Sequence, residues 1–322
     1  MTNFQVYKKI LSFSLVNFLV DILSLAQFIG FCTLGFIIGM KASSDGAIAL
    51  LGLGIGFILG IVVSVLINIF LKNRIKAAQI AIMVKGVTEG NLPEHAFKEG
   101  FNEIKGRFGR ITAFFFITNA IKGIFNQLGR TINKIGTALG GQTGNTITSV
   151  IDSAVQTLIG YLCDCCLGWI LYRKDENAAK AGCEGAVIFF KHGKTLIKNI
   201  GRIFGMGALS FVVIAGAFTG VGYLVLSQFP QAVQAISDAI IATGENVPEF
   251  VYSINTLALV VSFIGGVIVW SMLHSMLVRP FILVGVMRNF MAAGIADIPS
   301  EKDFAMLDSK SSKFRKLHAN AQ

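Results

Sequence analysis

Charged residues are scarce in this sequence. Asp, Glu, Lys and Arg together make up 14% of its 322 residues, whereas soluble domains contain about 25%. Hydrophobic residues make up 53%, and the mean hydropathy is +0.67. A water-soluble fold could not bury that much apolar surface. The composition therefore predicts an all-α, polytopic transmembrane helix bundle.

Motifs of soluble enzymes are also missing. The sequence has no His-Glu-x-x-His, no Gly-x-Ser-x-Gly and no P-loop, so nothing in it favours an enzyme or a cofactor. The four histidines are widely scattered: His95, His192, His274 and His318. The Cys-x-Cys-Cys run that starts at Cys163 lacks the spacing of structural zinc sites. We therefore predict a protein without enzymatic activity, cofactor or metal, whose cysteines are small packing residues or, in a eukaryotic host, lipidation sites.

Six apolar segments are long enough to cross a membrane, which requires about 20 residues. They are residues 16–40, 47–71, 111–128, 147–172, 203–228 and 256–286. The third segment allows a second interpretation, because Asn119, Lys122 and Asn126 recur on one helical face and also suit a helix that lies in the membrane interface. We expect one membrane domain over residues 1–300, followed by a basic cytoplasmic tail at 301–322.

The distribution of Lys and Arg predicts the orientation in the membrane. Residues 72–110 contain eight of them, residues 173–202 seven and residues 301–322 five, whereas residues 229–255 contain none. Basic loops stay on the cytoplasmic side, so both termini are expected in the cytoplasm. The net charge of +10 is then explained by contact with anionic inner-leaflet lipids, and not by nucleic acid.

Two of the basic segments, residues 73–108 and 176–202, have the pattern of amphipathic helices. We expect each to lie on the inner leaflet with its apolar face towards the lipid. Both lead into a span through similar residues, Gly106 to Arg110 and Gly201 to Gly205. This similarity suits either an internal duplication, as in many transporters, or shared constraints at a cytoplasmic entry.

One of these segments carries a resemblance. Within residues 178–204, His192, Gly193 and Lys194 are followed by Asn199. The segment is similar to the part of choline transporter-like proteins that enters a late membrane helix, and the chain resembles six-helix bacterial integral membrane proteins. The resemblance implies six spans in a bacterial inner membrane and favours transport, and it implies no substrate-binding residue.

The fourth span has the clearest polar stripe. Asp152 and Gln156 lie on one helical face, and Asp164 sits further round, inside the end marked by Trp169 and Arg173. An ionisable residue at that depth indicates a pathway or a buried ion pair. Asp152 could also be hydrated near the outer surface. Arg279 and His274 of the last span are candidate partners for Asp164, and Asp21 in the first span raises the same question.

Glycines recur at helical spacing in two spans. The second span contains Gly52, Gly56 and Gly60 on one face, and Gly216 and Gly220 repeat the spacing in the fifth. Such faces allow close helix packing, within the chain or between the subunits of a homo-oligomer, although they can also line a pore. The sequence therefore favours a channel or transporter for a small solute or ion. The alternatives are a non-catalytic membrane scaffold or subunit of an assembly, and then a lipid-acting enzyme.

Overall fold

The computed structural model describes residues 1–42, 46–107, 109, 118, 120–127, 145–197, 200–241 and 247–321. Within these residues every regular element is a helix, which confirms the predicted all-α class. The chain divides into two compact units. Unit 1 comprises Met1–Ile200 and Pro280–Gln322, and unit 2 comprises Gly201–Arg279.

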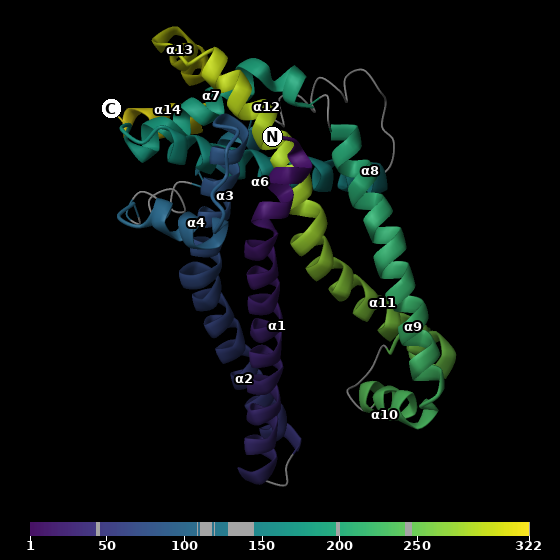
Figure 1. The fold of residues 1–322 in the computed structure, drawn as a ribbon. Helices are drawn as coiled ribbons and strands as arrows, with labels where there is room; N and C mark the ends of the chain where they lie inside the picture. Colours follow the sequence, from purple (N-terminus) through teal and green to yellow (C-terminus); the bar gives the residue numbers. More distant parts are fainter. Residues whose placement is uncertain are drawn as a thin grey trace. The chain divides into compact units, whose positions relative to one another are not determined.

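Unit 1 begins with a long helical hairpin. Helix α1 (Asn3–Ala42) lies beside a continuous helix made of α2 (Gly46–Ile67), the π-helical turn η1 (Asn68–Lys72) and α3 (Asn73–Thr88) (Figure 1). The first 92 residues contain no proline, so nothing removes a backbone hydrogen bond from either long helix. The outward side chains of α1 and α2 are mostly large, apolar and exposed.

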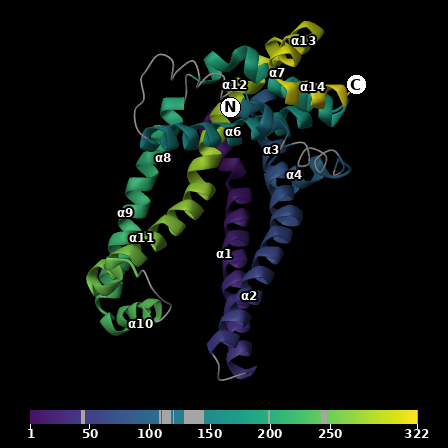
Figure 2. The same cartoon turned by 180° about the vertical axis from the view of Figure 1, so that it is seen from behind.

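The rest of unit 1 forms a helical head around a buried core. It contains α3, α4 (Ala96–Ile104), α6 (Asn145–Tyr172), α7 (Ala178–Ile197), α12 (Arg279–Ala296, from Pro280 on), α13 (Glu301–Lys310) and α14 (Ser312–Ala319). Trp169, Phe290 and Phe314 are fully buried there. Helix α6 runs crosswise to α1 (Figure 2). Large side chains in this core indicate that the head is held together by ordinary hydrophobic packing.

Unit 2 is a second apolar hairpin. Its elements are α8 (Ile200–Ser210, from Gly201 on), the π-helical turn η2 (Phe211–Ala215), α9 (Gly216–Ser227), α10 (Pro230–Ile241), the short 3₁₀ helix η3 (Glu249–Tyr252), α11 (Ile254–Leu273) and the π-helical turn η4 (His274–Val278). Helix α9 packs along α11. The amphipathic helix α10 buries Val233 against Leu257 and Ala258 of α11.

Among the residues that the structure describes, four helices are long and apolar enough to cross a membrane. They cover Asn3–Ala42, Ile48–Thr88, Gly205–Ser227 and Ile254–Ala296, and each contains or overlaps one of the predicted spans. The predicted third span, residues 111–128, lies mostly outside the described residues. The predicted fourth span, residues 147–172, is helix α6. Six spans are therefore not confirmed.

Most apolar residues that the structure describes in helix α6 are buried against other helices of the protein. From Ile159 to Leu171 all residues except Gly160 are buried, and α6 packs against α3 and α7. Hydropathy measures how much a segment prefers an apolar environment, and the interior of a head satisfies that preference as well as lipid does. An apolar run of this length, which the sequence predicts to be a membrane span, is therefore explained in α6 by burial inside the head.

The two predicted amphipathic segments also turn their apolar faces towards protein. In α4, Phe97 and Phe101 pack against the buried ring of Phe13 in α1, with centroid separations of 4.9 and 6.4 Å. In α7, Cys183 and Val187 are among the residues with no exposed surface. These faces contribute to the core of the head, whereas the sequence predicted that they face the inner leaflet.

Candidate functional site

Asp164, the strongest candidate from the sequence, forms an ion pair with Lys76. The Nζ atom of Lys76 in α3 lies 2.5 Å from Oδ1 of Asp164 in α6. The Asp164 side chain is 4% exposed and that of Lys76 is 34% exposed. A carboxylate buried this far is tolerated only when a cation or hydrogen-bond donor offsets its desolvation. The pair therefore fastens α3 to α6 at the edge of the head core.

Gln156, the other described member of the predicted stripe, has a partner of its own. The Nε2 atom of Gln156 donates a hydrogen bond of 2.8 Å to Oδ1 of Asn126, and Gln156 is exposed. Asn126 belongs to the helical residues 120–127. Asp152 lies in α6, but its side chain is outside the described part of the structure. Gln156 and Asp164 thus have different partners and different surroundings.

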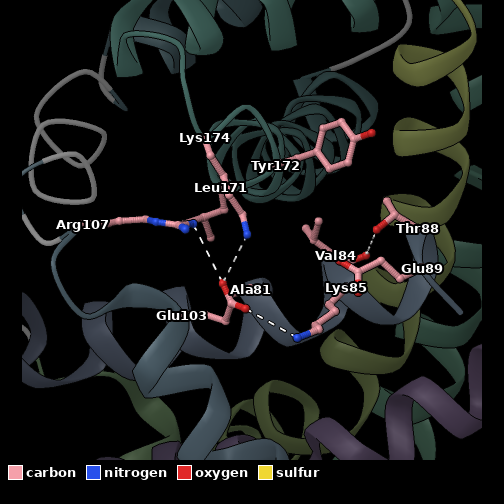
Figure 3. A pocket seen from close by; sticks show the side chains of 10 residues that line it. All are labelled: Ala81, Val84, Lys85, Thr88, Glu89, Glu103, Arg107, Leu171, Tyr172 and Lys174. Carbon is pink, nitrogen blue, oxygen red and sulfur yellow. Dashed lines mark hydrogen bonds and ion pairs between the residues drawn. The ribbon is translucent and has the colours of Figure 1, made fainter. Parts of the chain in front are cut away.

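A cluster of charges that the sequence did not single out surrounds Glu103 of α4. Its carboxylate lies 3.5 Å from Nζ of Lys85, 3.6 Å from Nζ of Lys174 and 3.9 Å from an Nη atom of Arg107. Figure 3 shows the three cationic side chains reaching Glu103 from different parts of the head. A cavity of about 40 Å³ lies among them, which is enough for a few water molecules.

The position of these cations has an electrostatic cause. Helices α3, α4 and α6 end at Thr88, Ile104 and Tyr172, so a cation lies within the last turn of, or just beyond, each C-terminus. Each helix C-terminus carries about half a negative charge. Together with Glu103 these ends offset most of the charge of the three cations. The cluster is therefore best described as a charge-balanced junction of three helices, and not as an anion site.

A second buried carboxylate, Glu184 of α7, is held by α6. The indole Nε1 of Trp169 donates a 2.7 Å hydrogen bond to Glu184, and the Nε of Arg173 lies 3.2 Å from the same oxygen. Trp169 has no exposed surface and the Glu184 side chain is 3% exposed. The sequence predicted that Trp169 marks a membrane interface, but the structure places it in the head core.

In the hairpin, Asp21 of α1 pairs with Lys72 at the end of η1. Their side chains are 26% and 29% exposed. One and a half turns further towards the hairpin tip, Gln27 donates to the carbonyl oxygen of Gly60 at 3.4 Å and accepts from Ser64 at 3.3 Å. Asp21 and Gln27 of α1 are thus both partnered by the helix that runs beside it.

Towards the hairpin tip the two helices touch through glycine. A Cβ atom built on Gly52 would lie 2.2 Å from the carbonyl oxygen of Gly35, and one built on Gly56 would lie 2.2 Å from that of Phe31. At Gly60 the nearest neighbour is the ring of Phe28, at 2.8 Å. The glycine face of α2 therefore packs against α1 of the same chain.

The glycine series in unit 2 lies differently. A Cβ atom on Gly216 or Gly220 would meet no atom of the described chain within 4 Å. The close approach of α9 and α11 occurs instead at Gly222, which faces Ser262, and at Gly266, which faces Thr219. The packing face predicted from the 216 and 220 spacing is therefore displaced around the helix in this structure.

The remaining candidates in unit 2 lie near the end of α11. The ring of His274 is 5.2 Å from that of Trp270, whose Nε1 donates to Oγ of Ser210 at 3.2 Å. Arg279 follows the π-helical turn η4 and is the first residue of α12. These contacts join α8 to α11 within unit 2.

Metal-binding and thiol chemistry receive no support from the described residues. These residues contain no group of three or more His, Cys, Asp or Glu side chains that could hold a metal ion. All five cysteines are free thiols, and four of them are buried. Burial, with smaller effects from Asp308 and Glu184, raises the pKa of Cys183 to about 12. A thiol that stays protonated is a poor nucleophile and a poor metal ligand.

The fold and these contacts define a class: an all-α protein that has four helices of membrane-spanning length and a packed helical head, compatible with an integral membrane protein. Comparison with family models, with curated proteins and with solved structures finds no match. The resemblance to six-helix bacterial membrane proteins and to choline transporter-like proteins therefore stays a prediction.

Proposed function

We propose that this chain is a non-catalytic membrane scaffold, a subunit that embeds two apolar hairpins in a bilayer and presents a helical head as an assembly surface. The observation that carries the proposal is that each pair of long helices closes on itself. Between α1 and α2 the backbones meet at Gly35 and Gly52, and in unit 2 Ala215 at the end of η2 meets Gly266 of α11. Helices whose backbones touch in this way leave no room for a solute between the two members of either pair.

The polar residues support the same proposal. Asp164, on which a permeation pathway would depend, pairs with Lys76 at the edge of the head core. The outward surfaces of the hairpins are apolar, with Leu51 of α2 68% exposed and Leu209 of α8 65% exposed. Apolar surface of this extent is stable against lipid or against the helices of another subunit.

The test uses the full chain reconstituted in two ways. In nanodiscs, its mass should correspond to a discrete assembly of two or more copies or to a complex with another membrane protein. In liposomes loaded with a pH indicator or with potassium, the flux of protons or potassium should equal that of protein-free vesicles. A monomer that conducts either ion would refute the scaffold.

A channel or transporter is the second candidate, and one observation favours it. The Asp21–Lys72 pair lies in an apolar hairpin and yet is about one-quarter exposed, and a charged group at such a place indicates function by default. If copies met around this face, the pair would line a polar path. Asp21→Asn should then abolish flux without changing the assembly mass, whereas Asp297→Asn, at an exposed site in the head, should change neither.

A further inference from the structure

A pocket in the head lies where the first apolar helix enters it. Residues from the start of α1 and from the start of α4 line a cavity of about 550 Å³ that is open on one side. The charged and aromatic residues of this basic pocket are Lys8, Lys9, Glu94, His95, Phe97 and Lys98. The hollow is broad and largely open, so it can receive a group that approaches from the surface.

The pocket has a surplus of positive charge. Lys8, Lys9 and Lys98 are all exposed, and Glu94 is the one acidic residue among those that line the cavity. The Nζ of Lys9 lies 3.5 Å from the backbone carbonyl oxygen of Glu94, so that contact neutralises no charge. With His95 neutral, the lining carries two net positive charges, which complement a phosphate group.

The position of the pocket along α1 identifies the source of that phosphate. After Phe4 near its start, the large exposed apolar side chains of α1 resume at Leu15 and continue with Leu19, and from there on they contact hydrocarbon in a membrane-embedded hairpin. Lys9 lies six residues before Leu15, which is about 9 Å along a helix. Lipid headgroups occupy about 5–8 Å on each side of the hydrocarbon core. The backbone of Lys9 therefore lies just outside the headgroup layer, and its side chain is long enough to reach the headgroups.

We propose that the basic pocket binds the phosphate of an anionic phospholipid headgroup. Phe97 at the rim is 36% exposed and stacks near Phe13, so an aromatic ring lies where headgroup and acyl chain meet, as is common at membrane interfaces. The proposal rests on the membrane placement of the α1–α2 hairpin and is independent of whether the protein is a scaffold or a transporter.

The experiment measures lipid retention by the full chain. The protein in detergent is titrated with phosphatidylglycerol or with phosphatidylcholine, and bound lipids are counted by native mass spectrometry. The pocket variant replaces Lys8, Lys9 and Lys98 with Gln. The matched control replaces three exposed lysines of the tail, Lys302, Lys310 and Lys316, with Gln as well. Both variants therefore lose three positive charges.

The unaltered protein and the control should retain phosphatidylglycerol in preference to phosphatidylcholine. In the pocket variant the affinity for phosphatidylglycerol should fall at least about tenfold, since each lysine near an anionic surface contributes about fivefold. Glycerol 3-phosphate added in excess should compete weakly, because it has no acyl chain. Equal retention by the two variants, or no preference between the lipids, would overturn the proposal.

Two outcomes separate this proposal from the proposed function. A protein that assembles and conducts no ions but binds both lipids equally would refute the basic pocket alone. A protein that conducts ions and still loses phosphatidylglycerol in the pocket variant would refute the scaffold alone. Because the three lysines are exposed, the circular dichroism and thermal unfolding of the pocket variant should match those of the control.

Discussion

Replacing Gly52 with Ala tests whether the α1–α2 hairpin is closed by backbone contact. The added methyl group would lie 2.2 Å from the carbonyl oxygen of Gly35, about 1.2 Å short of the 3.4 Å at which ordinary contacts begin. That neighbour is backbone and cannot rotate away, so the helices must separate there. Overpacking of this kind costs about 1–3 kcal/mol, whereas alanine regains up to about 1 kcal/mol of helix propensity.

We expect Gly52→Ala to lower the free energy of hairpin unfolding by about 1–2 kcal/mol, the upper part of the overpacking range less the gain in helix propensity. Gly54→Ala is the matched control, because it lies in the same helix and its Cβ would meet no atom of the described chain within 4 Å. The control should be neutral or slightly stabilising. Reversible unfolding in bicelles gives the two energies, and spin labels on α1 and α2 report the separation. Two variants that agree within about 0.5 kcal/mol would refute the close approach.

Three further predictions concern the head. Lys76→Met should destabilise it by about 3 kcal/mol, because Asp164 would stay buried without its cation; denaturant unfolding measures the loss, and Asp164→Asn in the same background should restore part of it. The backbone N–H of Ser300 lowers the pKa of Asp303, so its stabilisation is present above the ordinary carboxyl pKa of about 3.9 and is lost as the pH falls further. The protection of α13 amides against hydrogen exchange, measured relative to their intrinsic rates at each pH, should therefore fall below about pH 4, and protection that is unchanged at pH 3 would contradict this. Cys183, with a pKa of about 12, should resist alkylation at pH 8 in the folded protein and react in denaturant; rapid labelling of the folded chain would show that it is accessible.

The sequence predicted the helical class, and four of its six predicted spans coincide with helices of membrane-spanning length, because these features depend on local composition. It did not predict the environment of α6. A run such as Ile159 to Leu171 has the same hydropathy whether lipid or protein surrounds it. Within this run, only the charged residue Asp164 indicated an environment other than lipid. For the same reason the apolar faces of α4 and α7 were assigned to lipid, although helices of the same unit cover much of both faces and leave Phe97 of α4 only partly exposed.

The Glu103 junction could not be predicted, because its members come from three helices that meet only in the folded chain. Lys85, Arg107 and Lys174 look like ordinary basic residues of cytoplasmic loops in the sequence. The partner of Asp164 was missed for a related reason: Lys76 lies 88 positions earlier in the sequence, beyond any helical periodicity. The glycine spacing of α2, by contrast, is a local pattern, and Gly52 and Gly56 do lie at a close helix contact.

The helix that runs from Ile48 to Thr88 passes through 41 residues without a break, about 60 Å at the rise of an α-helix. One end lies at the hairpin tip and the other ends beside Glu103 in the head. A helix of this length behaves as a stiff rod, so a bilayer that becomes thinner and tilts the hairpin also tilts α3 within the head. The Lys76–Asp164 pair and the Glu103 junction are both attached to that moving segment. If the hairpin stands in a membrane, as proposed, a change in bilayer thickness should therefore reach the head through this one helix.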